Sequence, residues 1–421
     1  MIENFLNRLN DIKVLVKMDT EKLICVNDVL KDIYYKYISV LNPEKKKKIR
    51  IVEFIGKEFI PLMSKKDALF ASMFQGFHHR SSYINGTRMN NKYEYDLFLS
   101  LRLPLKEESV VDFINDRCDP GYASCIIRGD IKDAIASNAS DYDQEMKHQL
   151  LLKSTDGWKL GPGRTRQWIY SLVLNLTNDS ELTKILKKQR INSIRVKGLK
   201  ASGISTTLEI ILDDGTIVHV DIVPTFDFKC QQILHLDIIG KLLKPYWTSN
   251  LPKEYQEFAD IAKYDRFIIY DANIPKPKQT INKSQWRLDL IEMEKRILYE
   301  NGCAKMVVEL LECFRDGNPE IQQLSNYVLK TVVMLIIKEN PAYLWEEKFL
   351  AAYFLFALKT LSIKLEKRKL PFYFHPTSNI IDYVSSSSIQ KMVFWLKKTL
   401  KILERSYDNK RLKDIWFQYF M

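Results

Sequence analysis

The sequence predicts an α+β protein of two lobes, with a central mixed β-sheet, a long N-terminal helical spine and an all-helical C-terminal lobe. Three observations predict it. Residues 1–75 repeat apolar side chains at helical spacing, strand-forming segments and a hairpin turn occupy the middle, and helical periodicity returns after a Pro-rich stretch. We therefore expect the spine at 1–75, the sheet-containing core at 76–275 and the helical lobe at 280–421.

The composition is typical of a globular protein: 46% of the 421 residues are hydrophobic and 28% are charged, which excludes a disordered chain. The 64 Lys and Arg residues exceed the 52 Asp and Glu residues, and the net charge of +12 favours binding to a polyanion, either nucleic acid or an anionic membrane. The six cysteines form no C-x-x-C pair, and together with the six histidines they show no zinc-site spacing. Because the cysteines are few and irregularly spaced, a reducing compartment is expected.

The sequence contains neither a signal-peptide pattern nor an apolar run long enough to cross a membrane. The start of the chain lacks a basic region followed by an apolar one, and the longest apolar run, Phe349–Leu358, is too short to span a bilayer. We expect a soluble cytoplasmic protein with no membrane partner.

The predicted spine contains two helical stretches. Apolar residues recur every three or four positions from Val29 to Ile38 and again from Ile51 to Phe59. Between them, Asn42-Pro43-Glu44 indicates a turn and a helix start, and the basic run Lys45–Lys48 follows it.

The middle of the chain is predicted to contain strands. Tyr93–Leu99 consists of strand-forming residues, and Thr207–Leu212 and Ile217–Val223 flank Asp213-Asp214-Gly215, a strong hairpin turn. The Pro-rich segment Ile274–Lys278 then leads into the C-terminal lobe. The helices expected in that lobe are Ile291–Leu298, Ala304–Phe314, Ile321–Ile337, Phe349–Leu365 and Ile389–Leu403.

Three carboxylates stand out in the predicted strands. Glu94 and Asp96 are two residues apart, so both side chains leave the same face of their strand, and Asp221 interrupts a second, otherwise apolar strand. If the two strands lie close in one sheet, the three carboxylates converge and can hold two divalent metals that clamp a nucleoside triphosphate. The alternatives are a solvated sheet face for the pair and a salt bridge for Asp221.

Several segments resemble a known family. Tyr93–Phe98 and Val218–Ile222 resemble the acidic triad of the polymerase-beta-like nucleotidyltransferases, and more specifically the cyclic GMP-AMP synthase and cGAS-like receptor family. The other segments that resemble this family or its superfamily are Gly157–Leu160 with Trp168, Ser202-Gly203 with Thr206–Leu208, Trp286–Leu288 with Glu294-Lys295 and Ile297-Leu298 (its Trp-Arg helix), and Ser325–Tyr327 with Lys330-Thr331 (its nucleotide-contacting helix).

The resemblance implies roles by position. Glu94, Asp96 and Asp221 would be catalytic and hold two magnesium or manganese ions, and Asp221 would also help to activate the attacking ribose hydroxyl. Arg287 would contact a nucleotide base, and Tyr327 would stack on one. The other nucleotide-binding residues that it implies are Ser82 at the donor phosphates, Glu294 in the Trp-Arg helix, and Lys305 and Asn326 near the phosphates of the second nucleotide.

Three departures from the family pattern matter. Ser81 replaces an expected glycine beside Ser82, and Val308 replaces a second lysine of the vertebrate enzyme. The segment Ile297–Cys303 runs directly into the next helix without the zinc-binding insertion that the vertebrate enzyme uses on long double-stranded DNA. We therefore expect no zinc, and the chain resembles the invertebrate receptors, several of which respond to double-stranded RNA.

Two basic clusters are predicted to bind nucleic acid. An acid-free run between positions 184 and 200 and a second cluster on the spine suit a duplex, whose phosphates are contacted without reading bases. The alternative is a solvated charged face. The residues are Lys45, Lys46, Lys47, Lys48 and Arg50 in the spine cluster, and Lys184, Lys187, Lys188, Arg190, Arg195, Lys197 and Lys200 in the acid-free run.

The expected function is therefore that of an enzyme of innate immune signalling: a cyclic dinucleotide synthase that binds double-stranded RNA and makes a cyclic GMP-AMP type product from ATP and GTP. Two alternatives stay open, a catalytically silent member of the fold that binds nucleic acid or a partner, and a linear 2′–5′ oligoadenylate synthase. Pairing of two chains on the nucleic acid is also left open.

Overall fold

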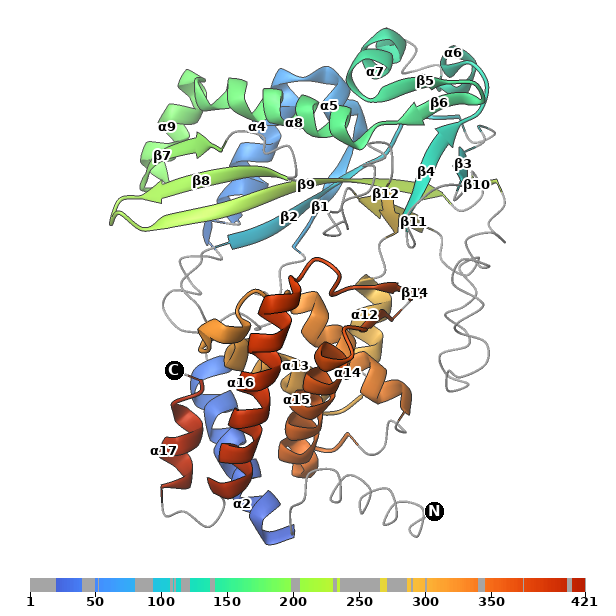
Figure 1. Ribbon diagram of the computed structural model, residues 1–421. Helices are drawn as coiled ribbons and strands as arrows, with labels where there is room; N and C mark the ends of the chain where they lie inside the picture. Colours follow the sequence, from blue (N-terminus) through green and yellow to red (C-terminus); the bar gives the residue numbers. More distant parts are fainter. Residues whose placement is uncertain are drawn as a thin grey trace.

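The computed structural model has two lobes, a sheet-containing lobe and a helical lobe, which lie one above the other in Figure 1. The predicted α+β class with a mixed sheet and a helical C-terminal lobe is confirmed. The structure describes residues 20–39, 50–51, 53–79, 94–106, 109, 111–114, 122–136, 141–197, 205–229, 233–234, 266–270, 286–288, 291–299, 301–339, 345–373, 375–406 and 411–420.

The N-terminal helices are divided between the two lobes. α2 (Thr20–Ile33) continues into the π-helix η1 (Tyr34–Ile38), and buries Val26, Leu30 and Ile33 in the helical lobe. The later elements η2 (Ile55–Phe59), α4 (Ile60–Lys66) and α5 (Ala68–Met73) belong to the sheet lobe (Figure 1). The helical spacing predicted for this region is thus confirmed in its described parts, and Lys45–Lys48 lie outside them.

A twelve-stranded sheet forms the other lobe. The strand order along its main path is β1-β2-β9-β11-β12-β4-β3-β10. Two branches leave this path: β8 pairs with β9 and is followed by β7, and β6 pairs with β4 and is followed by β5. The pairs β2–β9 and β3–β10 are parallel, and the other pairs are antiparallel. The strands are β1 (Phe74–His79), β2 (Glu94–Leu101), β3 (Val111–Ile114), β4 (Tyr122–Ile127), β5 (Leu151–Ser154), β6 (Gly157–Leu160), β7 (Ile191–Val196), β8 (Thr206–Leu212), β9 (Ile217–Lys229), β10 (Ile233–Leu234), β11 (Arg266–Tyr270) and β12 (Trp286–Leu288).

The predicted hairpin between β8 and β9 is confirmed. Gly215 has φ of +80°, a conformation that glycine adopts without steric cost, and the Leu212 amide donates to the Thr216 carbonyl at 2.9 Å. This turn fixes the register of the two strands, which pairs Thr207 with Asp221.

The two faces of the sheet differ in what covers them. Leu97 and Leu99 of β2 and Val220 and Ile222 of β9 are buried on the face that α8 (Pro162–Thr177), α4 and α5 cover. Because strand side chains alternate, Asp96 and Asp221 leave the opposite face, which is turned toward the helical lobe in Figure 1. The remaining helices of this lobe are α6 (Ile131–Ala134), α7 (Asp143–Gln149) and α9 (Ser180–Lys188).

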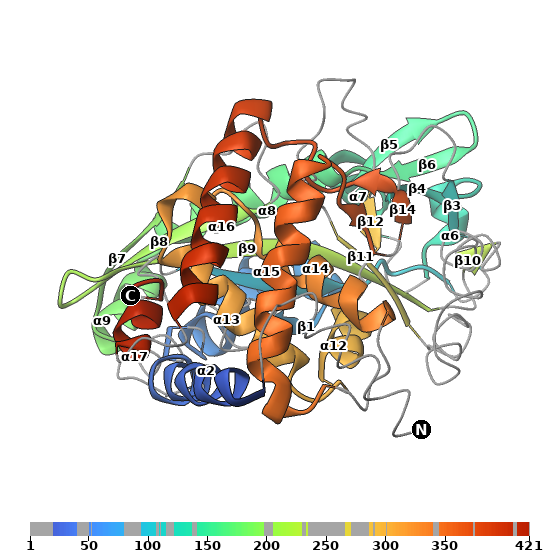
Figure 2. The same cartoon turned by 60° about the horizontal axis from the view of Figure 1, so that its bottom comes forward.

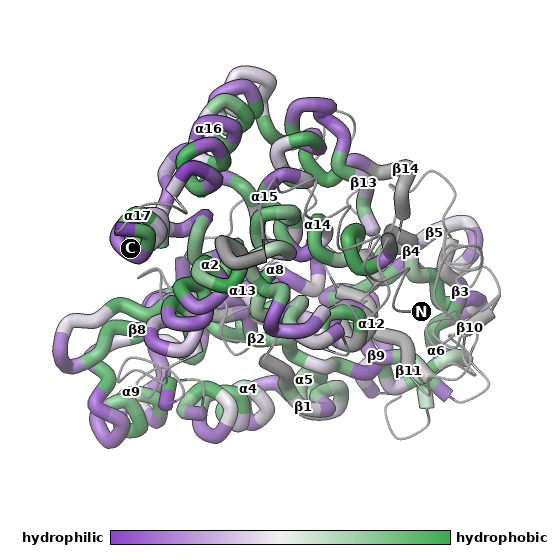
Figure 3. Tube along the Cα trace, turned by 90° about the horizontal axis from the view of Figure 1, so that it is seen from below, coloured by the Kyte–Doolittle hydropathy of each residue, from purple (hydrophilic) through white to green (hydrophobic). Residues whose placement is uncertain are grey.

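The helical lobe packs around α13 and α15, which lie side by side in Figures 1 and 2. Apolar segments, green in Figure 3, run along α14 and α15, and Phe314 and Phe354 meet edge to face at 5.8 Å. The helices are α12 (Ile291–Tyr299), α13 (Ala304–Asp316), η7 (Pro319–Ile321), α14 (Asn326–Glu339), η9 (Glu347–Phe349), α15 (Leu350–Glu366), α16 (Ser386–Arg405) and α17 (Leu412–Phe417). The lobe is expected to be all helical, but it also contains a two-stranded sheet of β13 (Pro371–Phe372) and β14 (His375–Asn379).

The sheet reaches further along the chain than residue 275. Trp286–Leu288, which resembles the start of a helix in sequence, forms β12 between β11 and β4. Trp286 is fully buried, its Nε1 donates to the Leu160 carbonyl at 2.8 Å, and its ring meets Phe226 edge to face at 5.3 Å. This residue therefore joins the strand to the core of the sheet lobe.

Replacing Trp286 by Ala is expected to destabilise the sheet lobe by about 3–5 kcal/mol, because it leaves a large cavity and an unpaired Leu160 carbonyl. Urea unfolding followed by circular dichroism measures the loss. Phe394→Ala is the matched control, since that ring is 73% exposed and its removal should cost less than about 0.5 kcal/mol. Equal losses in the two variants would contradict the prediction.

Candidate active site and nucleic-acid surface

The two acid-bearing strands are direct neighbours, as the sequence analysis required for a shared site. β2 and β9 pair in parallel, with Asp96 opposite Asp221 and Glu94 opposite His219. Asp96 is exposed and Asp221 is half-buried. The backbone of Glu94 places it two residues before Asp96 on the same face, and its side chain lies outside the described residues.

Asp221 is held from its other side by β8. The Thr207 hydroxyl donates to Asp221 Oδ1 at 2.5 Å, and the two residues are directly paired across the hairpin. Asp221 therefore lies between a hydroxyl donor on one neighbouring strand and a carboxylate on the other. With one oxygen held by Thr207, the carboxylate has a fixed orientation relative to Asp96.

The donor set fits a hard divalent cation. Two adjacent carboxylates repel each other on a sheet face unless a cation or solvent compensates their charge, and carboxylate oxygens are the ligands that Mg²⁺ and Mn²⁺ prefer. The described side chains contain no cluster of three metal-ligating groups, and the third acid, Glu94, is not among them. Asp96 and Asp221 thus supply the described part of a candidate metal site.

A polar cluster adjoins the carboxylates on the same face of the sheet. His219 Nε2 lies 3.3 Å from Glu209 Oε2, and Lys197 Nζ lies 3.1 Å from the same nitrogen and 3.7 Å from the Glu209 carboxylate. Lys197 is predicted from the sequence to lie on a nucleic-acid surface, whereas Thr207, Glu209 and His219 carry no predicted role. The structure places Lys197 beside the carboxylate face, paired with an acid.

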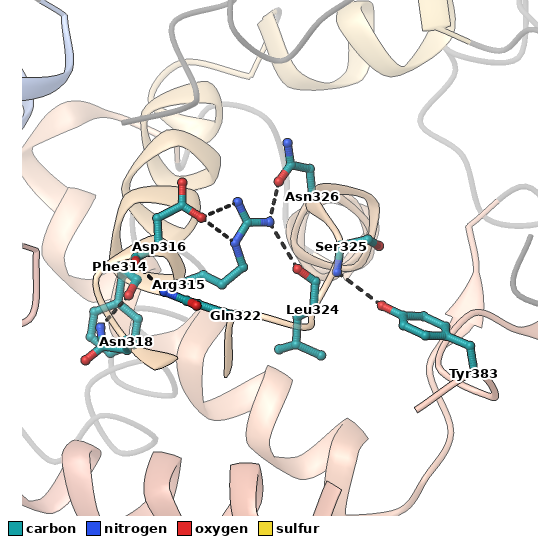
Figure 4. Close-up of polar contacts among 9 residues, drawn as sticks. All are labelled: Phe314, Arg315, Asp316, Asn318, Gln322, Leu324, Ser325, Asn326 and Tyr383. Carbon is teal, nitrogen blue, oxygen red and sulfur yellow. Dashed lines mark hydrogen bonds and ion pairs between the residues drawn. The ribbon is translucent and has the colours of Figure 1, made fainter. Parts of the chain in front are cut away.

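The predicted nucleotide-binding residues of the helical lobe lie at three places. Asn326 and Tyr327 begin α14, where the Asn326 side-chain oxygen accepts a hydrogen bond from Arg315 and the Tyr327 ring lies 5.6 Å from that of Phe372 (Figure 4 shows the first contact). Lys305 begins α13, with its Nζ 3.4 Å from Glu309 and 4.9 Å from the ring centre of Tyr299.

The third place is the contact between α12 and α14. Glu294 is buried, and its carboxylate lies 4.0 Å from Lys330 Nζ. Arg287 lies in β12, but its side chain is outside the described residues, as is the whole of Ser82. The nucleotide-binding roles of all six residues stay predictions.

Arg50, the described residue of the spine cluster, lies beside the acid-free run at the C-terminal end of α9. Lys184, Lys187 and Lys188 lie three and four residues apart, so they share one exposed face of α9. Arg50 donates a hydrogen bond to the Gln189 carbonyl, which brings the spine to the exposed Arg190. Arg195 is exposed on β7, while Lys200 and the four lysines at 45–48 lie outside the described residues.

The opposite end of α9 is anchored by ion pairs. Asp179 caps the helix by accepting from the Glu181 amide, and Lys66 of α4 lies 2.6 Å from the same carboxylate. The hydrogen bond from Lys66 holds the pKa of Asp179 below its ordinary value. Lys65 pairs with Glu181 at 2.7 Å, so the described acids of this helix face α4, and the basic end is left to solvent.

Three of the described cysteines, Cys125, Cys303 and Cys313, are buried, whereas Cys25 is exposed. Burial raises the pKa of Cys303 and of Cys313 to about 12, and that of Cys125 well above its ordinary range, so these thiols stay protonated at neutral pH. None of the helices in the described part of the chain combines the length and the hydropathy that a bilayer span requires.

The mixed sheet, with paired carboxylates on the face turned toward a helical lobe, fits the nucleotidyltransferase class that the sequence motifs resemble. The family comparison agrees: residues 83–300 match the Mab-21 protein nucleotidyltransferase domain, and residues 302–414 match the Mab-21 protein HhH/H2TH-like domain. The chain therefore belongs to the Mab-21 nucleotidyltransferase family.

The relatives of this chain include several insect proteins described as cyclic GMP-AMP synthase-like receptors. The protein of Ctenocephalides felis is 22% identical over 389 residues, which cover 90% of this chain and 84% of the relative. That of Trichogramma pretiosum is 24% identical over 367 residues, with 85% and 68% covered, and that of Tribolium castaneum is 22% identical over 396 residues, with 91% and 90% covered. The resemblance noted from the sequence motifs is thus confirmed along most of the chain.

Proposed function

We propose that this protein is a cyclic dinucleotide synthase that binds double-stranded RNA and converts ATP and GTP into a cyclic GMP-AMP type messenger in innate immune signalling. The observation that carries the proposal is the direct pairing of Asp96 with Asp221 on the face of the sheet that is turned toward the helical lobe. The similarity to insect cyclic GMP-AMP synthase-like receptors supports the substrate class and the signalling role.

The carboxylates carry the chemistry in this proposal. Glu94, Asp96 and Asp221 would hold two magnesium or manganese ions, which neutralise triphosphate charge and make a ribose hydroxyl easier to deprotonate. The Asp221 oxygen that Thr207 does not hold accepts the proton of the attacking hydroxyl. A bond then forms between the deprotonated ribose oxygen of one nucleotide and the α-phosphorus of the other, and the bond from that phosphorus to the pyrophosphate leaving group breaks. A second, similar transfer closes the ring.

The other predicted site residues would bind and orient the nucleotides. Arg287 and Tyr327 would recognise the bases, by hydrogen bonding and by stacking. Glu294 acts through Lys330, because a buried carboxylate beside an ammonium group fixes the lysine on α14. Ser82, Lys305 and Asn326 are the proposed phosphate contacts.

The proposed RNA surface comprises the exposed face of α9 and the adjoining Arg50 and Arg190, with Arg195, Lys197, Lys200 and Lys45–Lys48 as further contacts. An acid-free cationic face attracts the closely spaced phosphates of a duplex, and release of condensed counterions makes such binding steeply salt-dependent. A-form geometry and the 2′-hydroxyls would distinguish RNA from DNA.

Reversing the charge of Lys184, Lys187 and Lys188 together is expected to raise the dissociation constant for duplex RNA by at least about tenfold and to lower the salt slope of binding by about 2–3. Fluorescence anisotropy with labelled duplex RNA at several salt concentrations measures both. The same triple change at Lys391, Lys398 and Lys401 on α16, exposed in the other lobe, controls for net charge. Equal losses in the two triple variants would refute this assignment of the surface.

A product assay tests the proposed function as a whole. Purified protein receives labelled ATP and GTP with Mg²⁺ or Mn²⁺ and with double-stranded RNA, double-stranded DNA or no nucleic acid, and mass spectrometry identifies the product. A cyclic dinucleotide formed with RNA supports the proposal. Product with DNA alone would refute the RNA activator, a linear oligoadenylate would indicate an oligoadenylate synthase, and no product at all would favour a silent binding protein.

A further inference from the structure

A buried guanidinium lies beneath the first turn of α14. The Arg315 side chain, in the last turn of α13, is only about 5% exposed. Its Nε and Nη2 donate to Asp316 Oδ1 at 2.8 and 2.6 Å, and its Nη1 donates to the Leu324 carbonyl at 3.1 Å and to Asn326 Oδ1 (Figure 4). One cation thus holds both the backbone and a side chain at the start of α14.

The same turn is held from a second direction. The Ser325 amide donates to the Tyr383 hydroxyl at 3.1 Å, and that hydroxyl donates to the Gln323 carbonyl at 3.3 Å. The Ser325 hydroxyl accepts from the Val328 amide at 3.3 Å, as a helix cap does. The turn is therefore fixed between α13 and the segment before α16.

Arg315 determines which way the Asn326 amide points. A guanidinium has donors and no acceptor, so the atom of Asn326 that faces it must be the carbonyl oxygen. The amide nitrogen, which is a donor, then lies on the side away from Arg315, as Figure 4 shows. Donors of this kind suit the oxygen acceptors of a phosphate or a base.

The turn lies at the end of the helical lobe nearest the sheet. Tyr383, which contacts Ser325, lies three residues before the start of α16, and α16 begins at the upper end of that lobe in Figure 1. The face of the sheet that bears Asp96 and Asp221 is turned toward this end. A nucleotide held at the carboxylates would extend toward Asn326.

We propose that Arg315 is a positioning residue that presents the Asn326 amide N–H groups to an acceptor of the bound nucleotide. This assignment rests on the function proposed above. A pre-oriented donor loses little conformational freedom on binding, so fixing Asn326 in advance increases affinity without any contact between Arg315 and the ligand. Asp316 neutralises the buried charge, which is needed because an uncompensated buried cation is strongly destabilising.

A double-mutant cycle tests the assignment. The dissociation constant of a non-hydrolysable ATP or GTP analogue with Mg²⁺ is measured by calorimetry for the wild type, Arg315→Met, Asn326→Ala and the double variant, well below the melting temperature of each. Each single change is expected to weaken nucleotide binding about tenfold, and Arg315→Met should have almost no further effect once Asn326 is Ala. Arg405→Met, on the exposed end of α16, is the matched control.

Asn326→Asp provides a test that does not depend on Arg315→Met folding. An aspartate still accepts from Arg315, so the melting temperature should stay within about 3 °C of wild type, but it lacks the amide donor and should weaken binding at least about tenfold. Additive effects in the cycle, or wild-type affinity in Asn326→Asp, would overturn the assignment alone. A wild-type protein that binds no nucleotide would overturn the proposed function and this assignment together.

Discussion

Asp96→Asn and Asp221→Asn should each lower the rate of nucleotidyl transfer by about 10³-fold or more. The two carboxylates are directly paired on neighbouring strands and face the helical lobe, so each is placed to share a metal ion with the other. An amide is a neutral and weaker ligand, and the loss of several kcal/mol of transition-state stabilisation corresponds to about three powers of ten in rate. Single-turnover assays with saturating activator and ATP plus GTP measure the change.

Asp213→Asn is the control for this pair of variants. Asp213 lies on the same hairpin as Asp221 but at its exposed tip, where asparagine is an equally good turn residue. It should keep nearly full activity, and all three proteins should melt within a few degrees of wild type. An Asp96→Asn enzyme with more than a tenth of wild-type activity would contradict the assignment of the site.

Thr207→Val is expected to slow the reaction by about 10- to 100-fold, because Thr207 acts through its hydrogen bond to Asp221. Its hydroxyl fixes Asp221 Oδ1, and partners of this kind orient ligating carboxylates. Valine has nearly the same shape and removes only the donor. Because the defect acts through a metal ligand, the Mg²⁺ or Mn²⁺ concentration needed for half-maximal rate should rise, while the KM for nucleotide changes less.

Thr207→Ser separates the hydroxyl from the methyl group. Serine restores the donor at the same strand position and should recover most of the lost activity and the wild-type metal requirement. If serine were as slow as valine, or if valine lowered the melting temperature without altering the metal dependence, Thr207 would serve packing rather than orientation of Asp221.

Much of the sheet could be predicted from local patterns. The turn at Asp213–Gly215 is a local signal, and once it fixes the hairpin register, the position of Thr207 opposite Asp221 follows by counting residues. The pairing of β2 with β9 is different, because it joins segments more than a hundred residues apart. Local patterns predict the two strands but not their pairing, which is expected only from the family resemblance.

Other features depend on tertiary contacts that no local pattern encodes. β12 is three residues long and is a strand only because β11 and β4 lie on either side of it. Arg315 precedes an acid at a helix end and looks like an ordinary surface charge in sequence, yet it is buried beneath α14. The contact of Arg50 with Gln189 likewise joins residues that are far apart in the chain.

The most direct test of the central claim is to count the metal ions bound at the paired carboxylates. Electron paramagnetic resonance titration gives the number and affinity of Mn²⁺ ions bound per chain when the protein is saturated with a non-hydrolysable ATP analogue. Wild type and Asp213→Asn should bind two ions, and Asp96→Asn and Asp221→Asn should lose at least one of them or bind it at least about tenfold more weakly. Wild-type stoichiometry and affinity in both site variants would contradict a metal-dependent nucleotidyl transfer site at Asp96 and Asp221.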